Sequence, residues 1–171
     1  MMEYLLDTSV FVQAQRRYYQ FEVFPGFWEY CIQKFIDGSI STVTQVYEEI
    51  QAGDDELAHW MKGNYPRKSL ESPQNNVDAI GHYQKMFTWA QSHYMQKGVD
   101  ITFAADVADP WLCACACLEN LTVVTQEVAG GTNYKGGKGV KIPDICKQFD
   151  IECIDTFELL KRLKARFVLE S

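Results

Sequence analysis

The sequence has no apolar run that approaches the roughly 20 residues needed by a membrane-spanning helix. Its first residues lack the basic segment and long apolar core that are typical of a signal peptide. None of its six cysteines forms the C-x-x-C pair of a zinc site, and small disulfide-framed secreted domains are shorter and less apolar. We therefore expect a cytoplasmic protein without a membrane partner, whose cysteines are buried reduced thiols.

The sequence also has no excess of positive charge. It contains 16 basic and 23 acidic residues, for a formal net charge of −7. Non-specific coating of nucleic acid depends on neutralising phosphates with Lys and Arg, so the composition argues against proteins of that class. An enzyme acting on nucleic acid is not excluded, because a local basic loop and a bound divalent metal can supply the positive charge.

The composition is that of a globular protein, with 47% hydrophobic and 13% aromatic residues in a chain of 171. This length predicts one domain, residues 1–171, that buries about 70% of its unfolded surface. Strand-like and helix-like patterns alternate along the chain, which is typical of an α/β fold with a mostly parallel central sheet. The expected strands are residues 4–6, 39–44, 121–125 and 151–154.

Two regions have less regular patterns. Residues 64–73 look like a polar connection around Leu70, followed by one long helix from Pro73 to about Lys97 with Ser72 as its cap. The last expected helix covers residues 156–167. Its spacing predicts a buried face formed by Phe157, Leu160, Leu163 and Phe167.

Acidic residues stand at equivalent places around the expected sheet. Asp7 ends the first strand, Asp109 opens the helix before strand 121–125, and Glu127 follows that strand by two residues. Because the carboxyl ends of parallel strands meet at one edge of a sheet, these side chains are expected to converge. Each also has a simpler explanation: Asp7 and Asp109 suit helix caps, and Glu127 is an ordinary loop acid.

A fourth acid, Glu48 or Glu49, lies in the helix after the second strand. The buried face of that helix is set by Val43, Val46, Tyr47 and Ile50. At 100° per residue, Glu49 falls about 110° from the centre of this face and Glu48 about 150°. Glu49 is thus expected at the rim of a cleft, with Glu48 in solvent, and we select Glu49.

Several carboxylates in one place repel each other and raise one another's pKa values, a cost that a bound divalent cation removes. Hard oxygen ligands with open positions suit Mg²⁺ or Mn²⁺. Such ions, singly or in pairs, activate water for in-line attack on a phosphodiester. The sequence therefore predicts metal-assisted phosphodiester hydrolysis. The expected catalytic and metal-binding residues are Asp7, Glu49, Asp109 and Glu127.

A loop rich in Gly and Lys, residues 130–141, follows Glu127. Its lysines are Lys135, Lys138 and Lys141. They can hold an RNA backbone, with Arg16 and Arg17 as a second phosphate contact; the alternative is a mobile, solvated loop. No Ser-His-Asp or Cys-His arrangement can be assembled from the sequence.

Taken together, these segments resemble the PIN domain family. The matching pieces are YLLDTSVF, VYEEI, DPWLCACACLENLTVVTQE and IPDICKQFDIECID, and only residues 54–103 match weakly. The resemblance implies a three-layer α/β/α sandwich and a metal-dependent ribonuclease with RNA as its substrate. Asp7, Glu49 and Asp109 match the first three acids of the family, while Glu127 stands where the family usually has Asp.

The resemblance also implies supporting groups. Thr8 or Ser9, together with Thr125, match hydroxyls that orient carboxylates or contact metal-bound water in this family. Asp106, three residues before Asp109, is either an additional or substitute metal ligand or an acid of the turn before the helix, and the turn is favoured.

Kinship with PIN domains further suggests the toxin half of a prokaryotic toxin–antitoxin pair. An antitoxin protein and a second copy of the chain are then the expected partners. RNA maturation or decay is another role of PIN-like proteins. The main alternative is a catalytically weak or inactive PIN-like module that acts through a partner protein, and a DNA-directed structure-specific nuclease is a weaker one.

Overall fold

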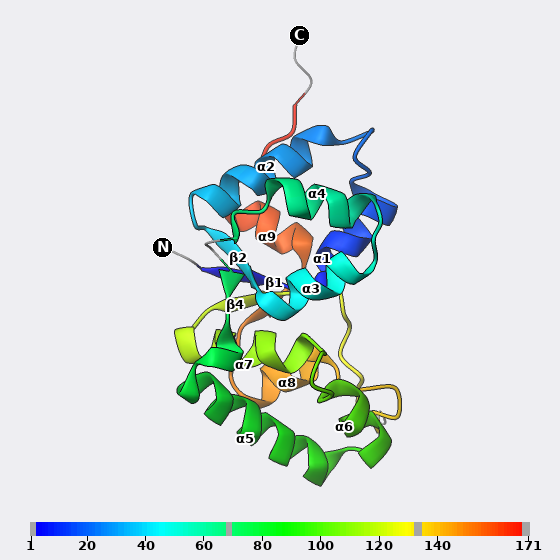
Figure 1. Cartoon of the computed structure of the whole chain (residues 1–171), viewed down its shortest axis with the longest axis vertical. Helices are drawn as coiled ribbons and strands as arrows, with labels where there is room; N and C mark the ends of the chain where they lie inside the picture. The colour runs from blue at the N-terminus through cyan, green and yellow to red at the C-terminus, as the bar shows by residue number, and fades with distance from the viewer. Residues whose placement is uncertain (1–2, 68–69, 132–134, 169–171) are drawn as a thin grey trace.

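A parallel sheet runs through the middle of the molecule (Figure 1). The structure is a computed structural model that describes residues 3–67, 70–131 and 135–168. Within these residues the sheet has five strands in the order β3-β2-β1-β4-β5, and all neighbouring pairs are parallel. The strands are β1 (Tyr4–Leu6), β2 (Ile40–Val43), β3 (Leu70–Glu71), β4 (Thr122–Val124) and β5 (Cys153–Ile154).

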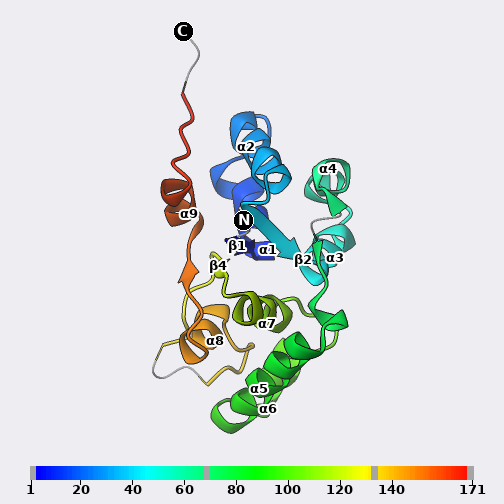
Figure 2. The ribbon, with the colours of Figure 1, turned by 90° about the vertical axis from the view of Figure 1, so that its left-hand side faces the viewer.

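Helices cover both faces of this sheet, as Figures 1 and 2 show. On one side lie α1 (Thr8–Gln13), α2 (Pro25–Ile36), α4 (Glu56–Asn64) and α9 (Thr156–Arg162), with α3 (Thr44–Ala52) packed beside α4. On the other side lie α7 (Asp109–Glu119) and α8 (Ile142–Gln148), with α5 (Val77–His93) and α6 (Gln96–Thr102) further out. The chain is therefore a three-layer α/β/α sandwich, as the sequence predicted.

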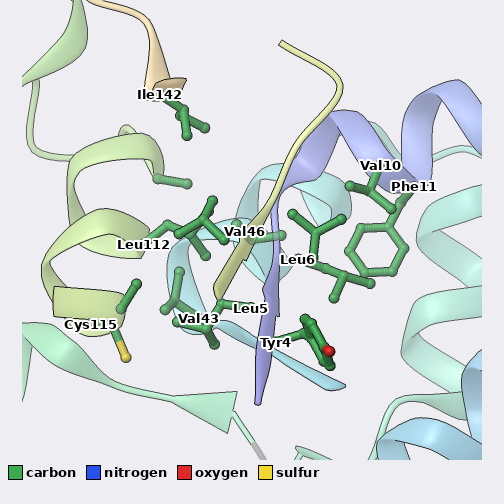
Figure 3. Close-up of a cluster of buried hydrophobic side chains, with 14 of the residues drawn as sticks. Tyr4, Leu5, Leu6, Val10, Phe11, Val43, Val46, Leu112, Cys115 and Ile142 are labelled. Atoms are coloured by element: carbon green, nitrogen blue, oxygen red, sulfur yellow. The ribbon is translucent and has the colours of Figure 1, made fainter. Parts of the chain in front are cut away.

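The core forms on both faces of β1, the central strand. Figure 3 shows Leu6 on the side of Val10 and Phe11 from α1, and Leu5 on the opposite side toward Leu112 of α7. Successive strand residues point to opposite faces, so an apolar strand with no polar alternation is one covered on both sides. No helix among the described residues is long and apolar enough to cross a membrane.

The cysteines agree with expectation in part. All six cysteines are free. Four are buried, namely Cys31, Cys113, Cys115 and Cys146, while Cys117 and Cys153 are partly exposed.

The expected polar connection around Leu70 is wrong in one respect. Leu70 and Glu71 form β3, which pairs with β2 through Thr42 and Val43. A strand of two partly buried residues at the edge of a sheet has too little apolar alternation to be recognised in a sequence.

The expected long helix from Pro73 is also wrong in its bounds. Pro73–Asn75 is a 3₁₀ turn, and α5 begins only after Asn76, whose side chain accepts hydrogen bonds from two backbone amides of the first turn. The helix ends at His93, and α6 follows separately. Between the two helices, the Met95 N–H donates to the Lys135 carbonyl of a distant loop at 2.9 Å.

The last helix is shorter than predicted. It ends at Arg162, and Lys164 takes a left-handed conformation with φ of 53°. The predicted face is confirmed only in part: Leu160 and Leu163 pack against the core, whereas Phe157 and Phe167 are 42% and 45% exposed. Leu159, which was not predicted, is buried.

Candidate active site

Asp7 lies at the carboxyl end of β1, where its backbone N–H donates to the Val124 carbonyl of β4 at 2.9 Å. The residue caps α1, and its Oδ2 accepts hydrogen bonds from Ser9 Oγ at 2.5 Å and Thr125 Oγ1 at 2.9 Å. Burial raises the pKa of Asp7, the charge of Glu127 adds to this, and the two hydroxyls oppose it. Asp7 is thus a cap, as the simpler explanation held, and also a buried acid that repels a neighbouring carboxylate.

Glu49 joins three elements at the same edge. Its Oε2 accepts from Thr8 Oγ1 at 2.6 Å, and its Oε1 accepts from the backbone N–H of Ala108 at 2.9 Å. Glu48 is exposed, so the helical phase correctly separated the two glutamates. The carboxylate of α3 is therefore fixed between the start of α1 and the start of α7.

Asp109 is the first residue of α7 rather than its cap. Ala108 occupies the cap position with helical backbone angles, and its N–H donates to Glu49 from another helix. The cap explanation for Asp109 is thus wrong. Burial, followed in order by the charges of Asp7, Glu127 and Glu49, raises the pKa of Asp109 to about 8, and the charge of Lys141 opposes this shift. Four carboxylates from four separate parts of the chain are therefore within electrostatic range of one another.

Glu127 behaves differently from the other three acids. Its Oε1 accepts from Lys141 Nζ at 2.9 Å, and its Oε2 accepts from the Ile142 backbone N–H at 2.9 Å. The Glu127 side chain is 22% exposed and that of Lys141 is 33% exposed. Glu127 thus lies at the cluster but is held by the start of α8.

The hydroxyls of Thr125 and Ser9 connect the acidic edge to the backbone after β4. Besides donating to Asp7, Thr125 accepts from the Glu127 backbone N–H at 3.0 Å and lies 3.2 Å from Ser9 Oγ. Ser9 Oγ also accepts from the Gln126 N–H at 2.9 Å. These hydroxyls join the ends of β1 and β4 into one network.

The donor set fits a hard divalent cation, because Asp7, Glu49, Asp109 and Glu127 offer only oxygen. Neither the Asp109 carboxylate nor Asp7 Oδ1 accepts a hydrogen bond from the described residues, whereas Asp7 Oδ2 is fully engaged by Ser9 and Thr125. Each oxygen of Glu49 and Glu127 accepts one hydrogen bond and keeps a second lone pair. Within the described residues, however, no three Asp, Glu, His or Cys side chains are already placed to hold one ion.

The remaining predicted residues lie farther out. Asp106 is exposed in the turn before α7, as the turn explanation requires. Arg16 and Arg17 are exposed in a π-helical turn, residues 14–18, which the sequence did not predict.

Lys135 and Lys138 are exposed in the loop after Glu127. The described part of this loop is attached to α6, because the Lys135 carbonyl accepts from the Met95 N–H at 2.9 Å. Residues 132–134 of the predicted loop lie outside the described part of the chain.

Two glycines allow the loop to approach α6 closely. A Cβ on Gly98 would lie 1.4 Å from the Gly136 carbonyl oxygen, so only glycine fits there. Farther along, the Val140 N–H donates to the buried Thr102 Oγ1 at 2.6 Å. These contacts fix the chain just before Lys141.

One pair was missed by sequence reasoning. Cys117 Sγ lies 3.2 Å from His82 Nδ1, so a Cys–His contact does exist between α7 and α5. Burial raises the pKa of Cys117, which disfavours the thiolate. The residues are 35 apart in the chain, and only the packing of α5 on α7 reveals the pair.

The fold and the acidic edge define an α/β/α protein with a cluster of carboxylates at the carboxyl ends of its parallel strands. Residues 4–167 match the model of the family described as "Domain of unknown function (DUF4411)", and the chain belongs to this family. A comparison with curated proteins finds no match. Among solved structures, the chain is similar to one in the crystal structure of VapBC2 from Rickettsia felis bound to a DNA fragment from the promoter, with a TM-score of 0.50 and 16% identity. The match covers 90% of this chain and 98% of the other, and at this identity the likeness is one of fold.

Proposed function

We propose that this protein is a PIN-type endoribonuclease that hydrolyses RNA phosphodiester bonds with Mg²⁺ or Mn²⁺. The observation that carries the proposal is the convergence of Asp7, Glu49 and Asp109 at one edge of the sheet. The charge of Glu127 contributes to the raised pKa values of both aspartates. The hydrogen bonds of Asp7, Glu49 and Glu127 fix the local backbone, but the mutual repulsion of four gathered carboxylates costs free energy that a bound cation offsets.

Each acid has a distinct part in this proposal. Asp7 and Asp109 offer the carboxylates to the cation, and Glu49 holds the start of α7 while offering its remaining lone pairs. The hydroxyls of Ser9 and Thr125 orient the Asp7 carboxylate. A bound divalent ion supplies an activated water and stabilises the leaving oxygen.

The substrate and partner are part of the same proposal. Exposed Lys135 and Lys138, with Arg16 and Arg17, offer positive charge to an RNA backbone in an otherwise acidic protein. Similarity in fold to VapBC2 supports a role as the toxin half of a toxin–antitoxin pair. An antitoxin protein is then the expected partner, and a homodimer and a cytoplasmic location remain part of the expectation.

A second candidate is a PIN-like binding module without turnover. It is favoured by the engagement of both Glu127 oxygens with Lys141 and Ile142 and by the absence, among the described residues, of three ligands already gathered around one point.

A metal titration separates the two candidates. For the nuclease, Mn²⁺ or Mg²⁺ raises the thermal midpoint of the purified chain, and labelled single-stranded RNA is cleaved with either metal but not with EDTA. Neither stabilisation nor cleavage, over millimolar metal and several RNA sequences, would favour the binding module.

A further inference from the structure

The ion pair between Lys141 and Glu127 is part of the acidic cluster, not of the outer surface. The two side chains are 33% and 22% exposed, and their charged atoms are 2.9 Å apart. The charge of Lys141 also acts on Asp109, where it opposes the effect of the three neighbouring carboxylates. An ammonium therefore faces two acids that come from different elements of the fold.

Hydrogen bonds fix the backbone on both sides of Lys141. The residue before it donates its N–H to Thr102, which is buried in α6, and the residue after it donates its N–H to Glu127. Lys141 is also only partly exposed, whereas Lys135 and Lys138 are exposed.

We propose that the Lys141 ammonium is the second cation of the site: it holds Glu127 away from the metal, leaves Asp7, Glu49 and Asp109 to bind a single divalent ion, and contacts the phosphate of the bound RNA. This inference rests on the proposed nuclease function. In it, Glu127 pairs with Lys141 instead of binding a second metal. Lys141 is then a catalytic residue of the phosphodiester reaction.

The chemistry suits this assignment. The lysine ammonium is a compact positive charge that can stabilise negative charge developing on phosphoryl oxygens, as Lys and Arg clamps do. Unlike a second metal, it needs no further oxygen ligands. Glu127 is one methylene longer than the Asp usual in PIN domains, so its carboxylate reaches the start of α8.

The test measures Mn²⁺ binding by isothermal titration and RNA cleavage by single-turnover kinetics in the same preparations. Wild type is expected to bind one Mn²⁺ per chain. Lys141→Met removes a positive charge beside the ligands, so Mn²⁺ should bind about ten times more tightly, the factor of one pKa unit. The same variant should lose about 10² to 10³ in the cleavage rate at saturating RNA, the size of one lost electrostatic donor.

Opposite effects on metal affinity and rate are the signature of this role, because a lysine needed only for folding or RNA affinity would not strengthen Mn²⁺ binding. Lys141→Arg keeps the charge and should recover part of the rate. Lys161→Met on α9 is the control: it removes one positive charge from a side chain that is 77% exposed and should leave both quantities unchanged. Glu127→Gln tests the pair from the other side and should still bind one Mn²⁺.

Two Mn²⁺ ions per wild-type chain, loss of Mn²⁺ binding in Glu127→Gln, or weaker Mn²⁺ binding in Lys141→Met would each overturn the role of Lys141 while leaving the nuclease intact. Absence of both Mn²⁺ binding and cleavage in wild type would overturn the nuclease function and this inference together.

Discussion

Glu49 accepts a hydrogen bond from the backbone N–H of Ala108 at 2.9 Å, and the residue after Ala108 is Asp109. One acid of the cluster therefore fixes the backbone from which another projects. The same Glu49 carboxylate accepts from Thr8, the residue after Asp7. The three acids are thus connected through groups adjacent to them, although they are far apart in the sequence.

The hydroxyl of Thr125 should be essential to this arrangement. Thr125→Val keeps the shape but removes the donor to Asp7 and leaves the Glu127 N–H without its acceptor. Leaving buried polar groups unsatisfied costs about 1–3 kcal/mol, so the free energy of unfolding should fall by that amount in urea titrations. Thr125→Ser keeps the hydroxyl and should lose clearly less. Equal losses in the two variants would show that the hydroxyl is not the stabilising group.

The positions of three acids were predictable because the local order of apolar and polar residues indicates where a strand ends and which face of a helix is buried. The run Tyr4 to Leu6 gave the end of β1, and hence Asp7. The apolar face of α3 separated Glu49 from Glu48. Asp109 preceded an apolar helix and a clear strand.

The environment of Glu127 was not predictable in the same way. Its partners lie 14 and 15 residues further on, and the path of the intervening loop depends on close contact between Gly98 and Gly136. Tertiary contacts therefore decided this case. The start of α5 was missed for another reason: Ser72 and Pro73 form a good local cap signal, but a second local signal, Asn76, caps the helix.

The attachment of the loop to α6 gives a second prediction. In Gly98→Ala the new methyl group would collide with the Gly136 carbonyl, 1.4 Å from the ideal Cβ, so the loop or α6 must shift. Overpacking of this kind costs about 1–3 kcal/mol, measured as a lower free energy of unfolding.

Gly81→Ala is the control, because open space surrounds its Cβ within α5. Replacing a helical glycine by alanine should stabilise the protein by roughly 0.5–1 kcal/mol. A Gly98→Ala protein as stable as wild type would contradict the close approach described here.

Asp109 gives the metal-free protein a distinctive pH dependence. Its pKa is raised from 3.8 to about 8, so between these values the folded state keeps a proton that the unfolded state has lost. The stabilisation is complete below about pH 4 and is lost as the pH rises toward 8; the free energy of unfolding should therefore fall over this range. In EDTA, the fall between pH 5 and pH 8 should be larger in wild type than in Asp109→Asn by on the order of 2 kcal/mol.

Urea unfolding at the two pH values measures this difference, and Mg²⁺ or Mn²⁺ should reduce it by binding the ionised carboxylates. The same pH profile in wild type and Asp109→Asn would show that Asp109 is not the group that keeps the proton.

The central claim is that the acids at the sheet edge hold a catalytic metal, and Asp7→Asn tests it most directly. Asparagine caps helices as well as aspartate does and removes a buried charge, so the thermal midpoint should not fall. With one ligand lost, Mn²⁺-dependent RNA cleavage should drop at least a hundredfold, as expected when a group acting directly on the reaction is removed. Cleavage of labelled RNA by wild type and by Asp7→Asn, compared at matched folded concentration in Mn²⁺, is the decisive measurement. Abolished cleavage with an unchanged thermal midpoint supports the account, and wild-type cleavage by Asp7→Asn contradicts it.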